Sequence, residues 1–514
     1  MKLTFYTLLF FFLPVYLHGQ EEKPVATYGT LELTRTQSLW FGSSNAAGMA
    51  ITPLHDYNLL EAQYDYTFGD YKQQQSGDKE RKAGVNVDGA LRLGKFFLWG
   101  NFLFSDSYVT GSKYNANRYE QQSDMPYYVA DTVLSDWKKQ SYDMTCKAAF
   151  PLSNRLILGG EIHYSARKAA KQMDPRSVLY CYAIEVKPAL VFGIADNCHA
   201  GLNFLYQNAF DRNTFTNSLQ YSSERVYMMK GLGNYSVGVV GGVGAISPFY
   251  YLIDRYGGGL QYDIAGDFGR LLAEVTYTRQ RTDAFEDPAK PRRRGAAQKT
   301  EYDGKIQRLK SGTLTHKLVV QATLSATNGI EYLQEYNGDY NVNQWITIAE
   351  YVKSTYKQQR LSLAYDLYSG ALSDYSWKAG INAAYNNRQD EYISPQAVFN
   401  TENVYTELLA AKRFIIGSTS TLHAELNVGY HLNIGGEYLY NGPEPSSVII
   451  RDFFAKDSNY FTAHYLQTGC NLYWSLALKS KSSVNFRLNG QWIKPDQTMA
   501  GDRHFASIAI GYIF

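Results

Sequence analysis

The chain ends in His504-Phe505-Ala506-Ser507-Ile508-Ala509-Ile510-Gly511-Tyr512-Ile513-Phe514. Every second residue counted back from Phe514 is apolar or aromatic, and the residues between them are mostly small at the centre of the stretch. Alternation with a period of two places the two sets on opposite faces of a β-strand. Terminal residues usually fray unless something ties them down. We therefore expect this last strand to be paired along its length.

This ending resembles the C-terminal signal of Gram-negative outer-membrane β-barrels, which finish in Phe after aromatic or apolar residues at alternate positions. The resemblance implies that Phe514, Tyr512 and Ile510 form an assembly signal for the barrel-assembly machinery. It also implies that the last strand closes a barrel against the first one, which begins near Tyr57. An edge strand of a soluble β-protein is the alternative interpretation.

The first residues have the features of a signal peptide. Lys2 supplies a positive charge, Leu3 to Leu17 form a mostly apolar run, and Gly19 is a small residue suited to cleavage. We therefore predict a signal peptide over 1–19. No later stretch reaches the roughly 18 apolar residues of a transmembrane helix. Export without a helical anchor leaves a soluble secreted protein or a barrel in the cell outer membrane.

Composition favours many strands and turns. The chain has 44 Tyr and 42 Gly against only 14 Pro, which fits strands with aromatic girdles. Lys plus Arg number 50 and Asp plus Glu number 48, so net charge gives no reason to expect a nucleic-acid partner. The four cysteines show no metal-ligand spacing, and we expect neither a metal nor a cofactor.

Alternating segments run through most of the chain. The clearest one covers 421–434, where seven apolar residues from Leu422 to Ile434 alternate with polar or small ones. Strands of soluble sandwiches average about 5–6 residues, whereas many segments here approach the roughly 9–11 residues needed to cross a bilayer. The length favours an all-β, porin-like transmembrane barrel over 55–514. Its antiparallel strands should number about 16, within a range of about 14–18.

The connections differ in length. Short turns are expected near Gly94, 151–154, 195–197, 266–269, 417–419 and 479–481, and long polar loops at 108–138, 167–178, 210–256, 283–310, 389–401 and 435–459. Short periplasmic turns and long external loops are typical of outer-membrane barrels. In 225–256 and 327–360 the alternation degrades, and strands, a lid or a lumen loop all fit.

A barrel of this size has an interior wider than its own side chains fill. Polar residues on the inward faces of the expected strands predict a lumen lined by both charges: Glu61, Asp65, Arg92, Glu161, Glu425 and Arg487. Such a lumen must be plugged or must pass a solute.

The most specific internal motif is Ser44-Asn45-Ala46-Ala47-Gly48-Met49-Ala50. It resembles the Asn-Pro-Ala-Gly-Leu-Ala element of the outer-membrane long-chain fatty-acid transporter superfamily, which includes a type IX secretion shuttle barrel. The resemblance implies that 20–54 folds into the lumen as a hatch in which Asn45, Ala47 and Gly48 take part. Ala46 replaces the proline and Met49 the leucine, and a linker of small residues is the alternative.

The basic run from Lys290 to Arg294 suits lipopolysaccharide phosphates or a solvated external loop. No nucleophile elbow, zinc-protease motif, phosphate loop or dinucleotide fingerprint occurs, so we do not expect an enzyme. An outer-membrane hydrolase with a loop nucleophile stays an alternative.

We expect uptake or passage of a small or amphipathic ligand across the outer membrane. The partners would be outer-membrane lipid and lipopolysaccharide. A structural or assembly role beside a larger receptor or secretion complex is the second hypothesis.

Overall fold

A computed structural model describes residues 27–119, 125–218, 223–338, 344–371, 374–478, 482–496 and 501–514. The predicted signal peptide at 1–19 lies outside these residues. Eighteen antiparallel strands form one closed barrel, in which each strand pairs with its neighbours in chain order. The barrel strands are β1 (Tyr57–Gly69), β2 (Lys79–Leu93), β3 (Phe96–Ser112), β5 (Ser135–Pro151), β6 (Leu156–Lys171), β7 (Arg176–Ala195), β8 (Cys198–Thr216), β11 (Phe249–Gly266), β12 (Gly269–Glu286), β13 (Arg292–Lys310), β14 (Leu314–Asn337), β15 (Gln344–Ala371), β16 (Asp374–Tyr392), β17 (Ala397–Ile416), β18 (Ser420–Tyr440), β19 (Tyr465–Ala477), β20 (Ser483–Pro495) and β21 (Arg503–Ile513).

The last strand closes the barrel against the first, as its alternation predicts. β21 pairs antiparallel with β1, with Ile510 opposite Ala62. Phe514 lies just beyond, and its carbonyl accepts a hydrogen bond from the Asn58 amide at 2.8 Å. The Phe514 amide returns one to the Asn58 carbonyl at 3.0 Å. Closure removes the free edges that a sheet would otherwise expose.

The barrel has 18 strands where about 16 were expected. The difference comes from segments without clear alternation. β13 occupies most of the predicted loop at 283–310, and its start, Arg292-Arg293-Arg294, is polar at three successive positions. The zone 327–360 contains the end of β14 and most of β15. Ladder hydrogen bonds hold β13, β14 up to Ile330 and β15 from Ser354 in the wall, whereas 331–337 and 344–351 pair with each other.

The two ends of the barrel differ in the length of their connections. One end carries tight turns such as those at Gly94 and Gly417, whose φ values of 60° and 71° suit glycine. The other end carries the long connections at 113–134, 217–248 and 441–464. Three expected long loops, at 167–178, 283–310 and 389–401, are mostly strand and leave only 172–175, 287–291 and 393–396 as connections. Strands that extend beyond the length needed for a bilayer cause this error.

The outward face of the wall is apolar. Leu260, Leu408 and Leu426 are each more than 60% exposed, and Phe514 is 54% exposed. Exposed aliphatic and aromatic side chains occur on strands all round the barrel. Soluble monomers rarely expose contiguous apolar patches beyond a few hundred Å², so this surface requires an apolar environment. No helix among the described residues has the length and hydropathy to span a bilayer.

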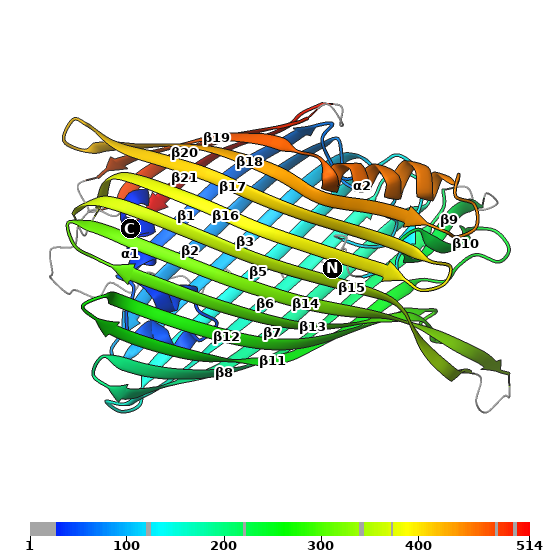
Figure 1. Cartoon of the computed structure of the whole chain (residues 1–514), viewed down its shortest axis with the longest axis horizontal. Coiled ribbons are helices and arrows are strands. Elements are labelled where there is room, and N and C mark those ends of the chain that lie inside the picture. Colours follow the sequence, from blue (N-terminus) through cyan, green and yellow to red (C-terminus); the bar gives the residue numbers. More distant parts are fainter. Residues whose placement is uncertain are drawn as a thin grey trace, which may run out of the picture.

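An N-terminal segment occupies the lumen at the short-turn end. It consists of α1 (Tyr28–Gln37) and the short 3-10 helices η1 (Leu39–Gly42) and η2 (Ala46–Ala50). Thr27 caps α1, since its hydroxyl accepts a hydrogen bond from the Thr30 amide. Figure 1 shows α1 inside the ring of strands, at the same end as the C-terminus. We call this segment, Tyr28 to Ala50, the plug.

A second small unit covers the opposite end. A three-stranded sheet contains β4 (Val129–Ala130), β9 (Glu224–Gly231) and β10 (Asn234–Val240). Next to it lie the π-helix η3 (Ile449–Phe454) and α2 (Ala455–Thr462). Figure 1 shows β9, β10 and α2 together at the end opposite α1. We call this unit the roof. Of the uncertain zone 225–256, β9 and β10 belong to this lid, whereas 249–256 belong to the wall strand β11.

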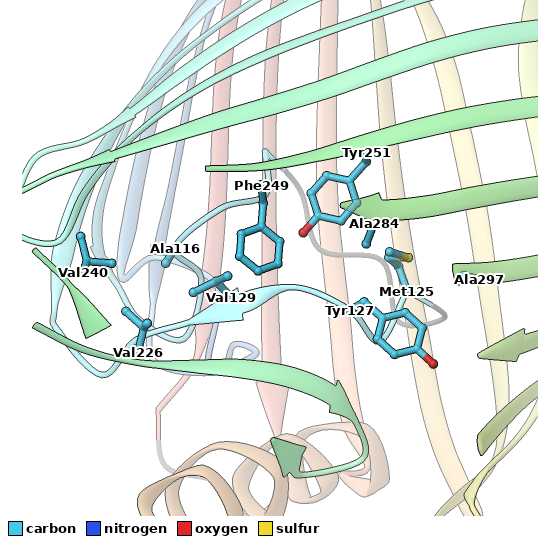
Figure 2. Close-up of a cluster of buried hydrophobic side chains, with 10 residues drawn as sticks. All are labelled: Ala116, Met125, Tyr127, Val129, Val226, Val240, Phe249, Tyr251, Ala284 and Ala297. Carbon is cyan, nitrogen blue, oxygen red and sulfur yellow. The ribbon is translucent and has the colours of Figure 1, made fainter. Parts of the chain in front are cut away.

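The roof sheet is fixed by hydrophobic clusters on both faces. On one face Val129, Val226 and Val240 pack against Phe249 and Tyr251 of the wall (Figure 2). On the other face Tyr227 and Met229 pack with Ile449 and Phe453 of η3. The roof is therefore a packed element.

Candidate functional site

Asn45 is the main polar anchor of the plug. Its side-chain amide donates to the carbonyls of Leu190 and Leu202, at 3.1 and 3.2 Å, and to Gln261 Oε1 at 2.8 Å. Its Oδ1 accepts from the Ala47 amide at 3.0 Å, which caps η2. The side chain is fully buried. Every polar atom of this amide therefore has a partner, and one residue ties the plug to β7, β8 and β11.

Ala47 and Gly48 allow close packing of η2. Ala47 is fully buried, and a Cβ added to Gly159 of the wall would lie 2.5 Å from the Ala47 Cα. A Cβ on Gly48 would lie 1.9 Å from the ring of Trp40. Small residues at these positions bring the η2 backbone against β6 and the Trp40 ring against η2. The predicted hatch residues thus lie together within the lumen; their role in gating stays a prediction.

Two further contacts hold the middle of the plug. The Trp40 indole donates to Asp263 Oδ2 at 3.0 Å, and the Ser43 hydroxyl donates to Glu274 Oε2 at 2.6 Å. Leu39 and Trp40 also pack in a buried cluster with Val191 and Leu272 of the wall. Sequence reasoning missed Asp263 and Glu274. The sequence offers only one indication of their role, which is that each is a carboxylate at an inward-facing position of a strand.

Four of the six predicted lumen residues form ion pairs on the inner wall. Arg487 Nη2 lies 2.7 Å from Glu61 Oε1. Glu161 lies between two lysines, 3.0 Å from Lys187 Nζ and 3.2 Å from Lys147 Nζ. Glu425 lies 3.9 Å from Lys378 Nζ. These pairs compensate buried charge inside the barrel.

The remaining two predicted residues differ in position. Asp65 Oδ1 accepts from the Ser507 hydroxyl at 2.6 Å across the β1–β21 seam. Arg92 is exposed at the short-turn rim, where its Nε donates to the Gly94 carbonyl at 3.3 Å. Arg92 therefore lies beside the turn, at the entrance of the lumen.

A cavity of about 620 Å³ lies between α1 and the wall. Both charges line it. Glu32 of α1 lies 2.8 Å from Lys378, Arg35 lies 2.5 Å from Asp88, and Lys305 donates to the Gly42 carbonyl at 2.9 Å. Polar contacts thus fasten α1 and η1 on several sides while space for solvent or a small solute remains beside them.

Two adjoining cavities lie beneath the roof, of about 290 and 590 Å³. Gln73, Gln358, Asn386 and Phe461 line both, so we treat them as one outer vestibule. Its aromatic side includes Tyr71, whose ring centroid lies 4.7 Å from that of Tyr460. A few amides among aromatic rings are typical of a site for a small organic ligand. Sequence reasoning did not identify the vestibule, because its residues come from strands and loops far apart in the chain.

Asp457 of α2 lines the smaller vestibule cavity. Burial raises the pKa of Asp457 to about 7, although the Gln74 amide, which donates to it at 2.7 Å, acts in the opposite direction. The carboxyl of Asp457 is therefore expected to change its charge near neutral pH, at the roofed end of the lumen.

No cluster of three or more metal-ligating side chains occurs in the described part of the chain. His423 and His431, which share the inward face of β18, have separate surroundings. His423 Nε2 lies 3.2 Å from Asp374 Oδ1, whereas the His431 ring stacks on Tyr465.

These features define a closed β-barrel whose lumen holds a plug at one end and a roofed vestibule at the other. The chain belongs to the family of unknown function DUF6850, whose pattern matches residues 46–514. A comparison with curated proteins finds no match. The family match does not establish the resemblance to the fatty-acid transporter superfamily, which stays a hypothesis.

Several solved structures are similar in fold. BauA, the ferric preacinetobactin receptor from Acinetobacter baumannii, is 11% identical with a TM-score of 0.41, over 90% of this chain and 80% of that one. The outer membrane transporter YddB from Escherichia coli is 8% identical with a TM-score of 0.41, over 88% and 80% of the two chains. The Pseudomonas putida toluene transporter TodX is 9% identical with a TM-score of 0.30, over 91% and 92%.

Proposed function

We propose that this protein spans the outer membrane and passes a small or amphipathic ligand through its lumen. The apolar outward face, with residues such as Leu260 and Leu426 more than 60% exposed, supports placement in a bilayer. The observation that carries the transport role is the plug. It fills one end of the lumen through side-chain contacts, yet it contributes no strand to the wall.

The proposed path has two stages. A ligand enters the outer vestibule, where Tyr71 and Tyr460 offer aromatic faces and Gln73 and Asn386 offer amides. It then reaches the cavity beside α1 when the segment Asn45 to Ala50 shifts. The contacts of Asn45 with Leu190, Leu202 and Gln261 would have to open in this step. The ion pairs Glu61–Arg487 and Glu161–Lys187 join wall residues to each other, so they can stay intact when this segment shifts.

The hatch can be tested by deleting 24–50 and measuring conductance in planar bilayers. The wall closes through β1 and β21 without the plug, so the truncated barrel should still insert, and its open-state conductance should rise severalfold. Deletion of Val243 and Gly244 is the matched control, since Val243 is fully exposed in a roof loop. Unchanged conductance after removal of 24–50 would contradict the hatch.

A second candidate role is assembly with a larger receptor or secretion complex. β14 pairs with β13 only as far as Ile330, whereas its pairing with β15 continues to Asn337 and Gln344. The resulting hairpin projects beyond the wall (Figure 1). Leu333, Ile346 and Ile348 on it are 52%, 43% and 58% exposed. An apolar projection of this kind favours contact with a partner protein.

A further inference from the structure

A groove with two basic residues lies on the outward face of β6, β7 and β8, towards the long-connection end. Lys168 is directly opposite Tyr180, and Tyr180 is directly opposite Arg212. Residues paired in this way lie on the same face of a sheet. That face is the outer one, because Tyr180 is 52% exposed and Tyr182 and Ile184, at the next alternate positions, are 46% and 44% exposed.

Below this row lies a cavity of about 420 Å³. Tyr142, Tyr182 and Phe210 line it together with Lys168, Tyr180 and Arg212. The Lys168 ammonium lies 5.5 Å from the centroid of the Tyr180 ring, which holds it over the groove. The groove is therefore aromatic along its walls and basic at its outer rim.

Neither basic residue is neutralised by a close carboxylate. Within the described part of the chain, no ion pair involves Lys168 or Arg212, and both side chains are exposed. Two carboxylates on strands beyond this groove, Asp106 on β3 and Asp254 on β11, already accept hydrogen bonds from other side chains. Asp106 accepts from Gln140 at 2.8 Å, and Asp254 accepts from Asn208 at 3.0 Å. Two uncompensated positive charges on the outer face call for an anionic partner.

We propose that this groove binds a phosphate-bearing lipid of the outer leaflet, with its phosphates on Lys168 and Arg212. Residues two strands apart are separated by about 10 Å, a spacing that suits two phosphates on one head group. Arginine binds phosphate through two parallel hydrogen bonds, and lysine binds it as a point charge. The acyl chains then follow the apolar face below, along Ile184 and Val186, which are 44% and 39% exposed.

A lipid fits these features better than free phosphate does, because free phosphate has no apolar part that could pack against the aromatic side chains of the groove. In the Lys290–Arg294 run, two of the basic side chains already have partners. Its Arg294 is paired with Glu286, and Arg292 stacks on Trp345 with its guanidinium carbon 4.2 Å from the ring centroid.

The test uses the full-length protein in neutral detergent, with retained lipid measured by native mass spectrometry. The probes are lipid A carrying two phosphates, phosphatidylethanolamine, and inorganic phosphate. The double variant Lys168→Gln/Arg212→Gln should lose at least tenfold in lipid A binding. Lys95→Gln/Arg155→Gln removes the same charge from exposed residues at the short-turn end and should bind as wild type does. Lys168→Arg/Arg212→Lys keeps both charges and should retain binding.

The proposal rests on placement in a bilayer, which heat-modifiable mobility on gels checks separately for each variant. A double variant that inserts normally and still binds lipid A like wild type would overturn the lipid site alone. Equal affinity for inorganic phosphate would also overturn it, since the groove would then contribute nothing. If the double variant fails to insert, Lys168→Gln alone replaces it, with a smaller loss expected.

Discussion

At the scale of single residues, a glycine of the wall allows the plug to pack closely, and an asparagine of the plug supplies its hydrogen bonds. Gly159 of β6 faces the lumen, and its missing Cβ makes room for the backbone of Ala47. Asn45 then supplies the polar contacts at the same place. A backbone neighbour cannot move aside as a flexible side chain can, so glycine at 159 is required for this packing.

Gly159→Ala should therefore loosen the plug. The new Cβ would lie 2.5 Å from both the Cα and the amide nitrogen of Ala47, and overpacking of this kind costs about 1–3 kcal/mol. We expect faster proteolysis within Tyr28–Ala50 and a higher conductance. Gly304→Ala on β13 is the control, because a Cβ there meets nothing within 4 Å. Equal behaviour of the two variants would show that Gly159 does not position the plug.

Among the elements, β21 decides whether the sheet becomes a barrel. It pairs with β20 on one side and with β1 on the other. Its outward residues Ile510 and Tyr512 belong to the apolar face, and the rings of Tyr512 and Phe514 stack with centroids 5.3 Å apart. The predicted assembly signal thus lies on the seam.

Deletion of Phe514 should impair insertion far more than any property of the lumen. It removes two backbone hydrogen bonds with Asn58 and the ring that stacks on Tyr512. We expect most of the protein to lose heat-modifiable mobility on gels. Phe514→Leu keeps the backbone bonds and should insert better than the deletion. Full insertion of the deleted chain would mean that the terminal pattern is not an assembly signal.

At the scale of the whole molecule, the closed wall carries three separate units at different places. The plug occupies one end, the roof covers the other, and the β14–β15 hairpin projects beyond the wall (Figure 1). Because each unit attaches to the wall through its own contacts, a change in one of them should leave the barrel closed.

The hairpin provides a test of the assembly role. Leu333→Ser, Ile346→Ser and Ile348→Ser together should abolish co-purification of a stoichiometric partner in mild detergent, while conductance stays unchanged. Leu152→Ser is the control, since Leu152 is 57% exposed at the opposite end. Absence of any partner with the wild-type protein would leave transport as the better-supported role.

The sequence by itself determined the class of fold. Alternation in segments such as 421–434 and 504–514 follows from the two-residue repeat of a strand, and long alternating strands with short and long connections in turn require a closed barrel. The inward position of Glu61, Glu161, Glu425 and Arg487 follows from the same repeat. Local periodicity carries this information because it does not depend on the partner strand.

Only the tertiary structure decided the number of strands, the roof and the sites. β13 and the β14–β15 hairpin lack clear alternation; pairing with β12 and β14 holds β13, and the two arms of the hairpin hold each other. The partners of Asn45 are about 145 to 216 residues away along the chain. The vestibule and the Lys168–Arg212 groove combine residues from separate strands. Such contacts depend on register and closure, which a pattern along one strand does not encode.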